Sequence, residues 1–186
     1  MAEAGGPLLI FTAVIAVIIV GISKSGFGAA FGSLAVPLLA LVTPPSHAAA
    51  LLLPSLLVMD LIGLVVFRRS FDRQLLKLLL PAALLGIGIG FAAFRHVSPE
   101  GLKLILGLIS VLFVMQRWLA SESVPTAGGH DALRGRFWGT LAGFTSFVAH
   151  AGGPPISMYL IPKQLDRRLY VGTTALLFAA VNLSKW

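Results

Sequence analysis

The sequence predicts an all-α protein, a polytopic transmembrane helical bundle with two broken-helix hairpins related as inverted repeats. Three observations predict it. Hydrophobic residues make up 57% of the 186 positions and charged residues only 11%, with a mean hydropathy of +0.93, whereas soluble domains carry roughly a quarter charged residues. Apolar runs of helical length alternate with short basic connections. Two of these runs are interrupted by glycine and proline. A water-soluble fold is therefore excluded, and the main partner of the surface is the lipid bilayer.

The first two apolar runs, 8–22 and 29–43, predict a helical hairpin. Each is about 15 residues, or about 22 Å of helix, which is short for a bilayer core of ~30 Å. The segment between them, 24–28, contains no polar turn. We therefore expect a hairpin over 8–43, either re-entrant or made of two short tilted spans, whose break lies inside the membrane.

The next three runs, 47–67, 75–94 and 101–119, are each long enough to cross the bilayer once. The sixth run, 137–161, is interrupted from His150 to Pro155, and proline cannot continue the hydrogen-bond ladder of a helix. It predicts a second hairpin of the same design. The last run, 169–186, predicts one further helix.

These runs divide the chain into two repeats. The first repeat is expected over 1–119 and a cytoplasmic linker over 120–136, where serine, proline and glycine are frequent. An incomplete second repeat is expected over 137–186, with the hairpin 137–161 and one helix. The first apolar run is expected to be retained, because no basic residue precedes it as in a secretory signal.

The basic residues predict the orientation. If each hairpin returns to its own side, the connections 68–77, 117–136 and 163–168 share one side of the membrane. That side holds ten basic residues and the other side only Arg95 and Lys103. The ten are Arg68, Arg69, Arg73, Lys77, Arg117, Arg134, Arg136, Lys163, Arg167 and Arg168. The rule that basic residues stay inside places these connections in the cytoplasm and the N-terminus outside.

This topology has the parity of inverted repeats. A hairpin and three crossings reverse the side from which the second hairpin enters. A shift of 122 residues also sets Gly21 on Gly143 and Asp60 on Asn182, although a few such identities arise easily by chance in apolar sequence.

The two breaks predict a binding site for an anion. A helix that restarts inside the membrane has free amide N–H groups and a positive dipole end, and glycine lets a ligand approach the backbone. Breaks from opposite hairpins are expected to face one another near the midplane. The candidate substrate-binding residues are Lys24, Ser25, Gly26, Phe27, Gly28, Gly32, His150, Gly152, Gly153, Pro154 and Asn182.

Each glycine and polar residue also has a structural interpretation. The spacing of Gly28 with Gly32 and of Gly139 with Gly143 suits close helix packing, and for 86–90 packing is the favoured interpretation. His150 could bind a ligand or cap a helix end. Asn182 could bind substrate or another helix, and the second has the better base rate.

Lys24 and Asp60 are charged residues within apolar surroundings. A cation near the bilayer centre costs ~3 kcal/mol or more unless it is paired or hydrated. Lys24 therefore contacts an anionic substrate, pairs with Asp60 or extends to the interface. Asp60 could carry a coupling ion, although structural pairing is the simpler interpretation.

The composition does not favour an enzyme. The sequence has no cysteine, no paired carboxylates, no metal-spaced histidines and no phosphate-binding loop for ATP. We expect no catalytic residues, metal or cofactor. Because the basic residues lie between apolar segments, the net charge of +7 indicates membrane topology and not a nucleic-acid partner.

Two segments carry a family resemblance. The first runs from Gly21 through Gly28, Gly32 and Pro37, and the second from Gly152 to Pro155 and on to Asn182. From about 8 to 186 the chain resembles TauE/SafE-type permeases, the sulfite and sulfonate exporter family. The resemblance implies a bacterial inner-membrane permease for small anions or organosulfur compounds. Because family members are usually longer, it also implies a chain that lacks the last helices.

The leading hypothesis is a secondary transporter for a small anion, such as sulfite, a sulfonate or a related organic acid, working by alternating access around the two breaks. The alternatives are a non-transporting membrane subunit of a partner complex and an anion channel. A homodimer is left open as a further partner.

Overall fold

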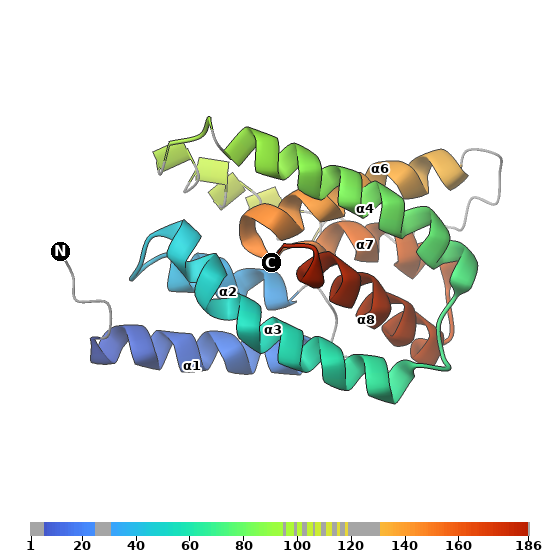
Figure 1. Cartoon of the computed structure of the whole chain (residues 1–186), viewed down its shortest axis with the longest axis horizontal. Helices are drawn as coiled ribbons and strands as arrows, with labels where there is room; N and C mark the ends of the chain where they lie inside the picture. Colours follow the sequence, from blue (N-terminus) through green and yellow to red (C-terminus); the bar gives the residue numbers. More distant parts are fainter. Residues whose placement is uncertain are drawn as a thin grey trace.

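The computed structural model describes residues 6–24, 31–94 and 131–185. Between 94 and 131 it describes only short pieces, which are 96–98, 100–101, 104–105, 107–108, 111–112, 115 and 118. Every regular element within these residues is a helix, which confirms the predicted all-α class (Figure 1).

The first hairpin begins with α1 (Pro7–Ile22). After the segment 25–30, which lies outside the described residues, the chain continues as the 3-10 helix η2 (Phe31–Leu34) and the five-residue helix α2 (Ala35–Leu39). At 1.5 Å per residue, α2 is only about 8 Å long and cannot cross a bilayer.

Two long helices follow, α3 (Pro45–Phe67) and α4 (Arg73–Phe94). By length and composition both can cross a membrane. Each contains one internal proline, Pro54 or Pro81, yet remains a continuous helix. The predicted runs 47–67 and 75–94 therefore form helices. Most of the predicted run 101–119 lies outside the described residues.

The second half consists of α6 (Asp131–Ala149), α7 (Gly153–Leu160), the 3-10 turn η3 (Ile161–Lys163) and α8 (Arg167–Leu183). The break between α6 and α7 lies where the sequence predicts it. α6, however, begins six residues before the apolar run at 137, so residues 131–136 are helical and not linker. Their charged side chains hide this first part of the helix from a hydropathy criterion.

Glycines bring α4 and α6 into close contact. A Cβ atom added at Gly86 would lie 1.9 Å from the carbonyl oxygen of Thr140, and one added at Gly143 would lie 1.9 Å from that of Ala83. Gly90 packs against the Phe147 ring in the same way, at 3.0 Å. The packing interpretation of the glycines at 86–90 is confirmed.

The two halves run in opposite directions. Figure 1 shows α1 and α3 running one way and α6 and α8 running back. The arms α2 and α7 fold back along their partners, so each hairpin returns to the end from which it started.

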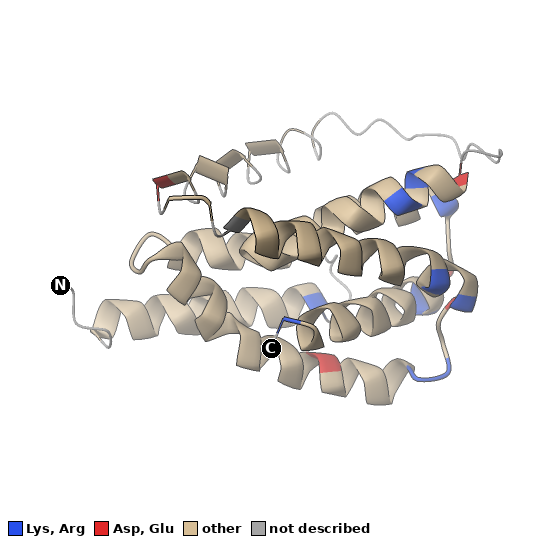
Figure 2. Cartoon of the chain, turned by 45° about the horizontal axis from the view of Figure 1, so that its top comes forward, with Lys and Arg blue, Asp and Glu red and all other residues tan. Residues whose placement is uncertain are grey.

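The basic residues gather at the end where α3 finishes and α4, α6 and α8 begin (Figure 2). Two contacts hold this end together. The amide of Asp72 donates to Thr173 Oγ1 at 2.9 Å, and Lys163 Nζ lies 2.7 Å from Asp131 Oδ2. The sequence places the connections 68–77, 117–136 and 163–168 on one side of the membrane. Their described residues therefore lie at one end of the helical bundle.

Candidate functional site

A cavity of about 100 Å³ lies between the two helix breaks. Asp60 of α3 and Asn182 of α8 line it together with residues of both breaks. Those of the breaks are Ser23, Lys24, Gly32, Ser146, His150 and Gly153. The contact between α7 and η2 brings the two breaks together. The structure thus assembles in one place the predicted residues Lys24, Gly32, His150, Gly153 and Asn182 and the predicted ion-coupling residue Asp60.

The other predicted residues are placed differently. Ser25, Gly26, Phe27 and Gly28 lie outside the described residues. Gly152 serves packing, because a Cβ atom there would lie 2.7 Å from the Phe178 ring and 2.8 Å from the carbonyl oxygen of Ala142. Pro154 is buried and does not line the cavity.

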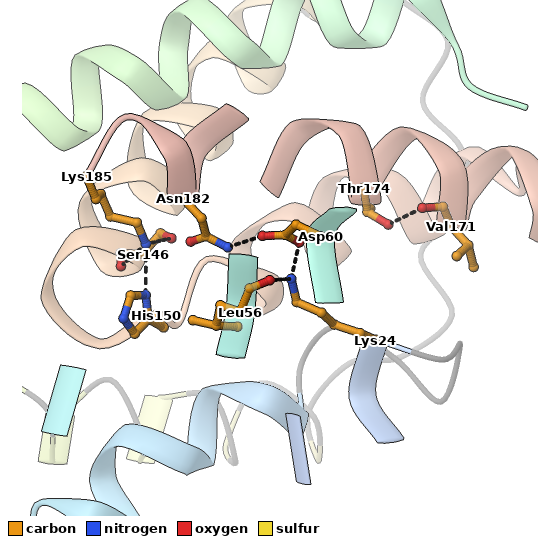
Figure 3. Close-up of polar contacts among 9 residues, drawn as sticks. All are labelled: Lys24, Leu56, Asp60, Ser146, His150, Val171, Thr174, Asn182 and Lys185. Carbon is orange, nitrogen blue, oxygen red and sulfur yellow. Dashed lines mark hydrogen bonds and ion pairs between the residues drawn. The ribbon is translucent and has the colours of Figure 1, made fainter. Parts of the chain in front are cut away.

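Lys24 forms an ion pair with Asp60 (Figure 3). Its Nζ atom donates to Asp60 Oδ1 and lies 3.5 Å from the carbonyl oxygen of Leu56. The Asp60 side chain is only 3% exposed, so the pair provides the compensation that a buried carboxylate requires. Since Lys24 also lines the cavity, pairing and ligand contact are compatible for this residue.

Asn182 holds the other side of the same carboxylate. Its Nδ2 atom donates to Asp60 Oδ2 at 2.6 Å, so that both oxygens of Asp60 accept hydrogen bonds. These two residues are the pair that the 122-residue shift aligns. The alignment could have signalled the contact, which the sequence analysis did not predict.

His150 ends α6 and fixes the geometry of the second break. Its φ of 51° is left-handed, a conformation that commonly terminates helices. Its amide donates to the carbonyl oxygen of Ser146 at 3.0 Å. The Thr145 hydroxyl ties the next residue back by donating to the Ala151 carbonyl oxygen at 2.9 Å.

The ring of His150 is bonded on both nitrogens. Nε2 lies 2.9 Å from the carbonyl oxygen of Ala49, and Nδ1 lies 2.8 Å from Lys185 Nζ. A carbonyl oxygen only accepts, so Nε2 carries the hydrogen, and Nδ1 accepts from the lysine. The ring is therefore a neutral imidazole of defined tautomer.

The breaks offer fewer free amides than the sequence analysis expects. α7 begins with Gly153, Pro154 and Pro155, and the two prolines have no N–H group. At the first break, the amide of Gly32 already donates to Ser23 Oγ at 2.9 Å. At these positions the expectation of free backbone donors is wrong. The polar residues that line the cavity include Lys24, Asp60 and Asn182.

Sequence reasoning missed Lys185. Its Nζ atom lies 3.0 Å from the carbonyl oxygen and 3.1 Å from the Oγ atom of Ser146, in addition to its contact with His150. One feature of the sequence could have indicated it. Lys185 lies at the end of the last apolar run and is not part of any basic connection.

The comparison with protein families decides the relationship. The family model described as "Sulfite exporter TauE/SafE" matches residues 13–186. The chain belongs to the TauE/SafE family. The searches of curated proteins and of solved structures found no match. Membership makes this TauE/SafE protein a membrane permease of the sulfite-exporter type, in a family of transporters and not of enzymes, and confirms the family resemblance of its two glycine-containing segments.

Proposed function

We propose that this TauE/SafE permease is a secondary transporter that binds small anions, such as sulfite, sulfonates or related organic acids, in the cavity between its helix breaks. One observation carries the proposal. The cavity lies between two hairpins of opposite direction and is bordered by lysines from both halves of the chain. Broken helices of secondary transporters form binding sites in this position.

Transport would proceed by alternating access, with the first repeat (1–119) rocking against the second (137–186). Two features support repeats of this kind. The helices α3 and α8 begin at Pro45 and Arg167, which the 122-residue shift superimposes, and they run in opposite directions while packing together. Movement of one repeat about the other would open the cavity to each side in turn.

We place the protein in a bacterial inner membrane as a multi-pass protein, with its basic end in the cytoplasm and its N-terminus outside. In this orientation an anion that leaves an inside-negative cell gains ~2.3 kcal/mol per charge per 100 mV. Export then needs no coupled ion. A structural role for Asp60 agrees with export that needs no coupled ion, since both of its oxygens are already bound by Lys24 and Asn182.

The test is flux from vesicles that contain the purified protein and are loaded with sulfite. We expect saturable efflux that accelerates when the lumen is made negative, and counterflow when sulfite is present on both sides. Vesicles without protein provide the baseline. Flux that never saturates would favour the channel alternative. No flux with any of a panel of sulfite, sulfonates and organic acids would contradict the proposal and favour a non-transporting subunit.

A further inference from the structure

The positive charge of the cavity is not balanced within the described residues. Lys24 and Asp60 neutralise each other as an ion pair, and the tautomer of His150 leaves that ring uncharged. Lys185, whose ammonium group lies against two cavity-lining residues, has only neutral acceptors there. When Lys185 is protonated, the described residues of the cavity and its immediate surroundings therefore carry one excess positive charge.

The contacts of Lys185 hold its ammonium group in place. An ammonium group has three hydrogens, and three acceptors face this one: Ser146 O, Ser146 Oγ and His150 Nδ1. The carbonyl oxygen belongs to the last turn of α6, where the helix dipole favours a cation. Figure 3 shows Lys185 on one side of the Asn182–Asp60 pair and Lys24 on the other.

We propose that Lys185 is the cation that binds the transported anion, and that it makes the cavity selective for small anions of single negative charge. This inference rests on the proposed transport function and identifies the residue and the substrate class. The anion takes the place of Ser146 Oγ as an acceptor of Lys185. Because a hydroxyl group both donates and accepts, Ser146 then turns its hydrogen toward the anion.

The charge and size of the cavity define the substrate class. One negative charge neutralises the site, whereas two would leave a net negative charge in a poorly solvated place. A cavity needs ~10–15 Å³ of such space to hold one water molecule, so a volume of about 100 Å³ has room for several. An oxyanion of about four heavy atoms, such as hydrogensulfite, therefore fits this space.

The first experiment uses the unaltered protein in sulfite-loaded vesicles and compares competing anions. Nitrate and formate, which are small and singly charged, are expected to compete with sulfite at concentrations about 10- to 100-fold lower than sulfate, because a hydrogen-bonded charge carries about that much binding. Equal competition by nitrate and sulfate would overturn the inferred selectivity and leave the transport function intact.

The second experiment tests the residue. Lys185→Met is expected to raise the sulfite concentration for half-maximal flux about 10- to 100-fold, whereas Lys185→Arg, which keeps the charge, stays closer to the unaltered protein. Lys77→Met, at an exposed lysine of the basic end, is the matched control and should change nothing. Stabilisation of each purified variant by nitrate, measured as a shift in melting temperature, gives a binding readout that does not depend on flux.

The outcomes separate the two proposals. Lys185→Met with unchanged half-saturation and unchanged stabilisation by nitrate overturns the role of Lys185 alone. Absence of anion flux in the unaltered protein overturns this inference together with the transport function. If Lys185→Met does not fold, the competition series is measured on Lys185→Arg and on the unaltered protein. A preference for singly charged anions in both proteins supports the inference, and the lack of this preference refutes it.

Discussion

The ion pair between Lys24 and Asp60 determines how substitutions in the cavity will affect stability. Removal of one partner of a buried pair leaves the other charge uncompensated, which costs ~3–5 kcal/mol, whereas replacement of both partners is often nearly neutral. Lys24 binds the carboxylate directly, and the Asp60 side chain is 3% exposed. The two residues should therefore behave as a unit.

We predict that Lys24→Met and Asp60→Asn each lower the melting temperature of the purified protein, and that the double variant melts above the lower of the two. Thermal unfolding in detergent measures this, with Lys77→Met as the control for loss of an exposed lysine. Losses that simply add in the double variant would show that the two charges do not stabilise each other.

A second ion pair, at the basic end, predicts a pH dependence. Lys163 donates to both oxygens of Asp131, and this hydrogen bonding is the main cause that holds the pKa of Asp131 below its ordinary value of 3.8. A carboxyl group with a lowered pKa stabilises the fold above its ordinary pKa, and this contribution is lost as the pH falls through the folded-state value.

Asp131→Asn should accordingly lower stability near neutral pH by less than ~1 kcal/mol, because Asp131 is partly exposed. The difference from the unaltered protein should shrink below about pH 4. Melting temperatures of both proteins between pH 3 and pH 7 test this. A difference that stays constant over this range would assign the effect to something other than the charge of Asp131.

Some residues of the cavity could be recognised from the sequence and others could not, for physical reasons. Charges inside apolar runs are conspicuous, so Lys24 and Asp60 were recognised, and their pairing was one of the alternatives. Lys185 stands at the end of a run, and only the fold shows its side chain turning back to Ser146 and His150. The expectation of free amide donors was wrong because the prolines that reveal the second break have no N–H group.

At the scale of elements, close packing of α4 on α6 depends on glycine. At Gly143 a Cβ atom would meet backbone, the Ala83 carbonyl oxygen, at 1.9 Å, so the helices would have to move apart. At Gly88 a Cβ atom would meet nothing within 4 Å. The chain thus offers the same substitution at a tight position and at an open one in the same helix pair.

We predict that Gly143→Ala destabilises the protein by about 1–3 kcal/mol through overpacking. Gly88→Ala should leave stability unchanged or raise it by up to ~1 kcal/mol, because alanine favours a helix over glycine. Melting curves of the two variants give the comparison. Equal melting temperatures for both would mean that α4 and α6 tolerate a wider separation than their contact implies.

Helices were predicted well where hydropathy alone defines them, as for α3 and α4. The second break was predictable because it combines glycine with two prolines. A single proline is a weaker signal, since Pro54 and Pro81 lie within continuous helices. The start of α6 was missed because it carries charged residues of the basic end, which lower hydropathy without ending the helix.

At the scale of the molecule, the gathering of basic residues at one end predicts the orientation in the membrane. The sequence contains no cysteine, so introduced cysteines can report it individually. Leu41 precedes α3 and is 80% exposed, while Arg69 follows α3 and is also exposed. The 23 residues of α3 separate the two positions by about 34 Å.

An impermeant maleimide added to intact cells should label Leu41→Cys and should label Arg69→Cys only after the membrane is opened. Labelling is read as a mass shift of the purified protein, with the unaltered cysteine-free chain as the blank. The reverse pattern would contradict the assignment of the basic end to the cytoplasm.

The hydrogen bond between Asp60 and Asn182 affects which form, inward-facing or outward-facing, the proposed transporter adopts without substrate. Under the 122-residue shift each residue is the counterpart of the other, so a local twofold axis would pass between them. Identical residues there would make this one contact the same from either half of the chain. A carboxylate facing an amide breaks that equivalence, because only the first half of the chain, through Asp60, carries the negative charge. The exchange of one carboxylate oxygen for an amide NH2 group would then contribute to a preference of the unloaded carrier for one side of the membrane.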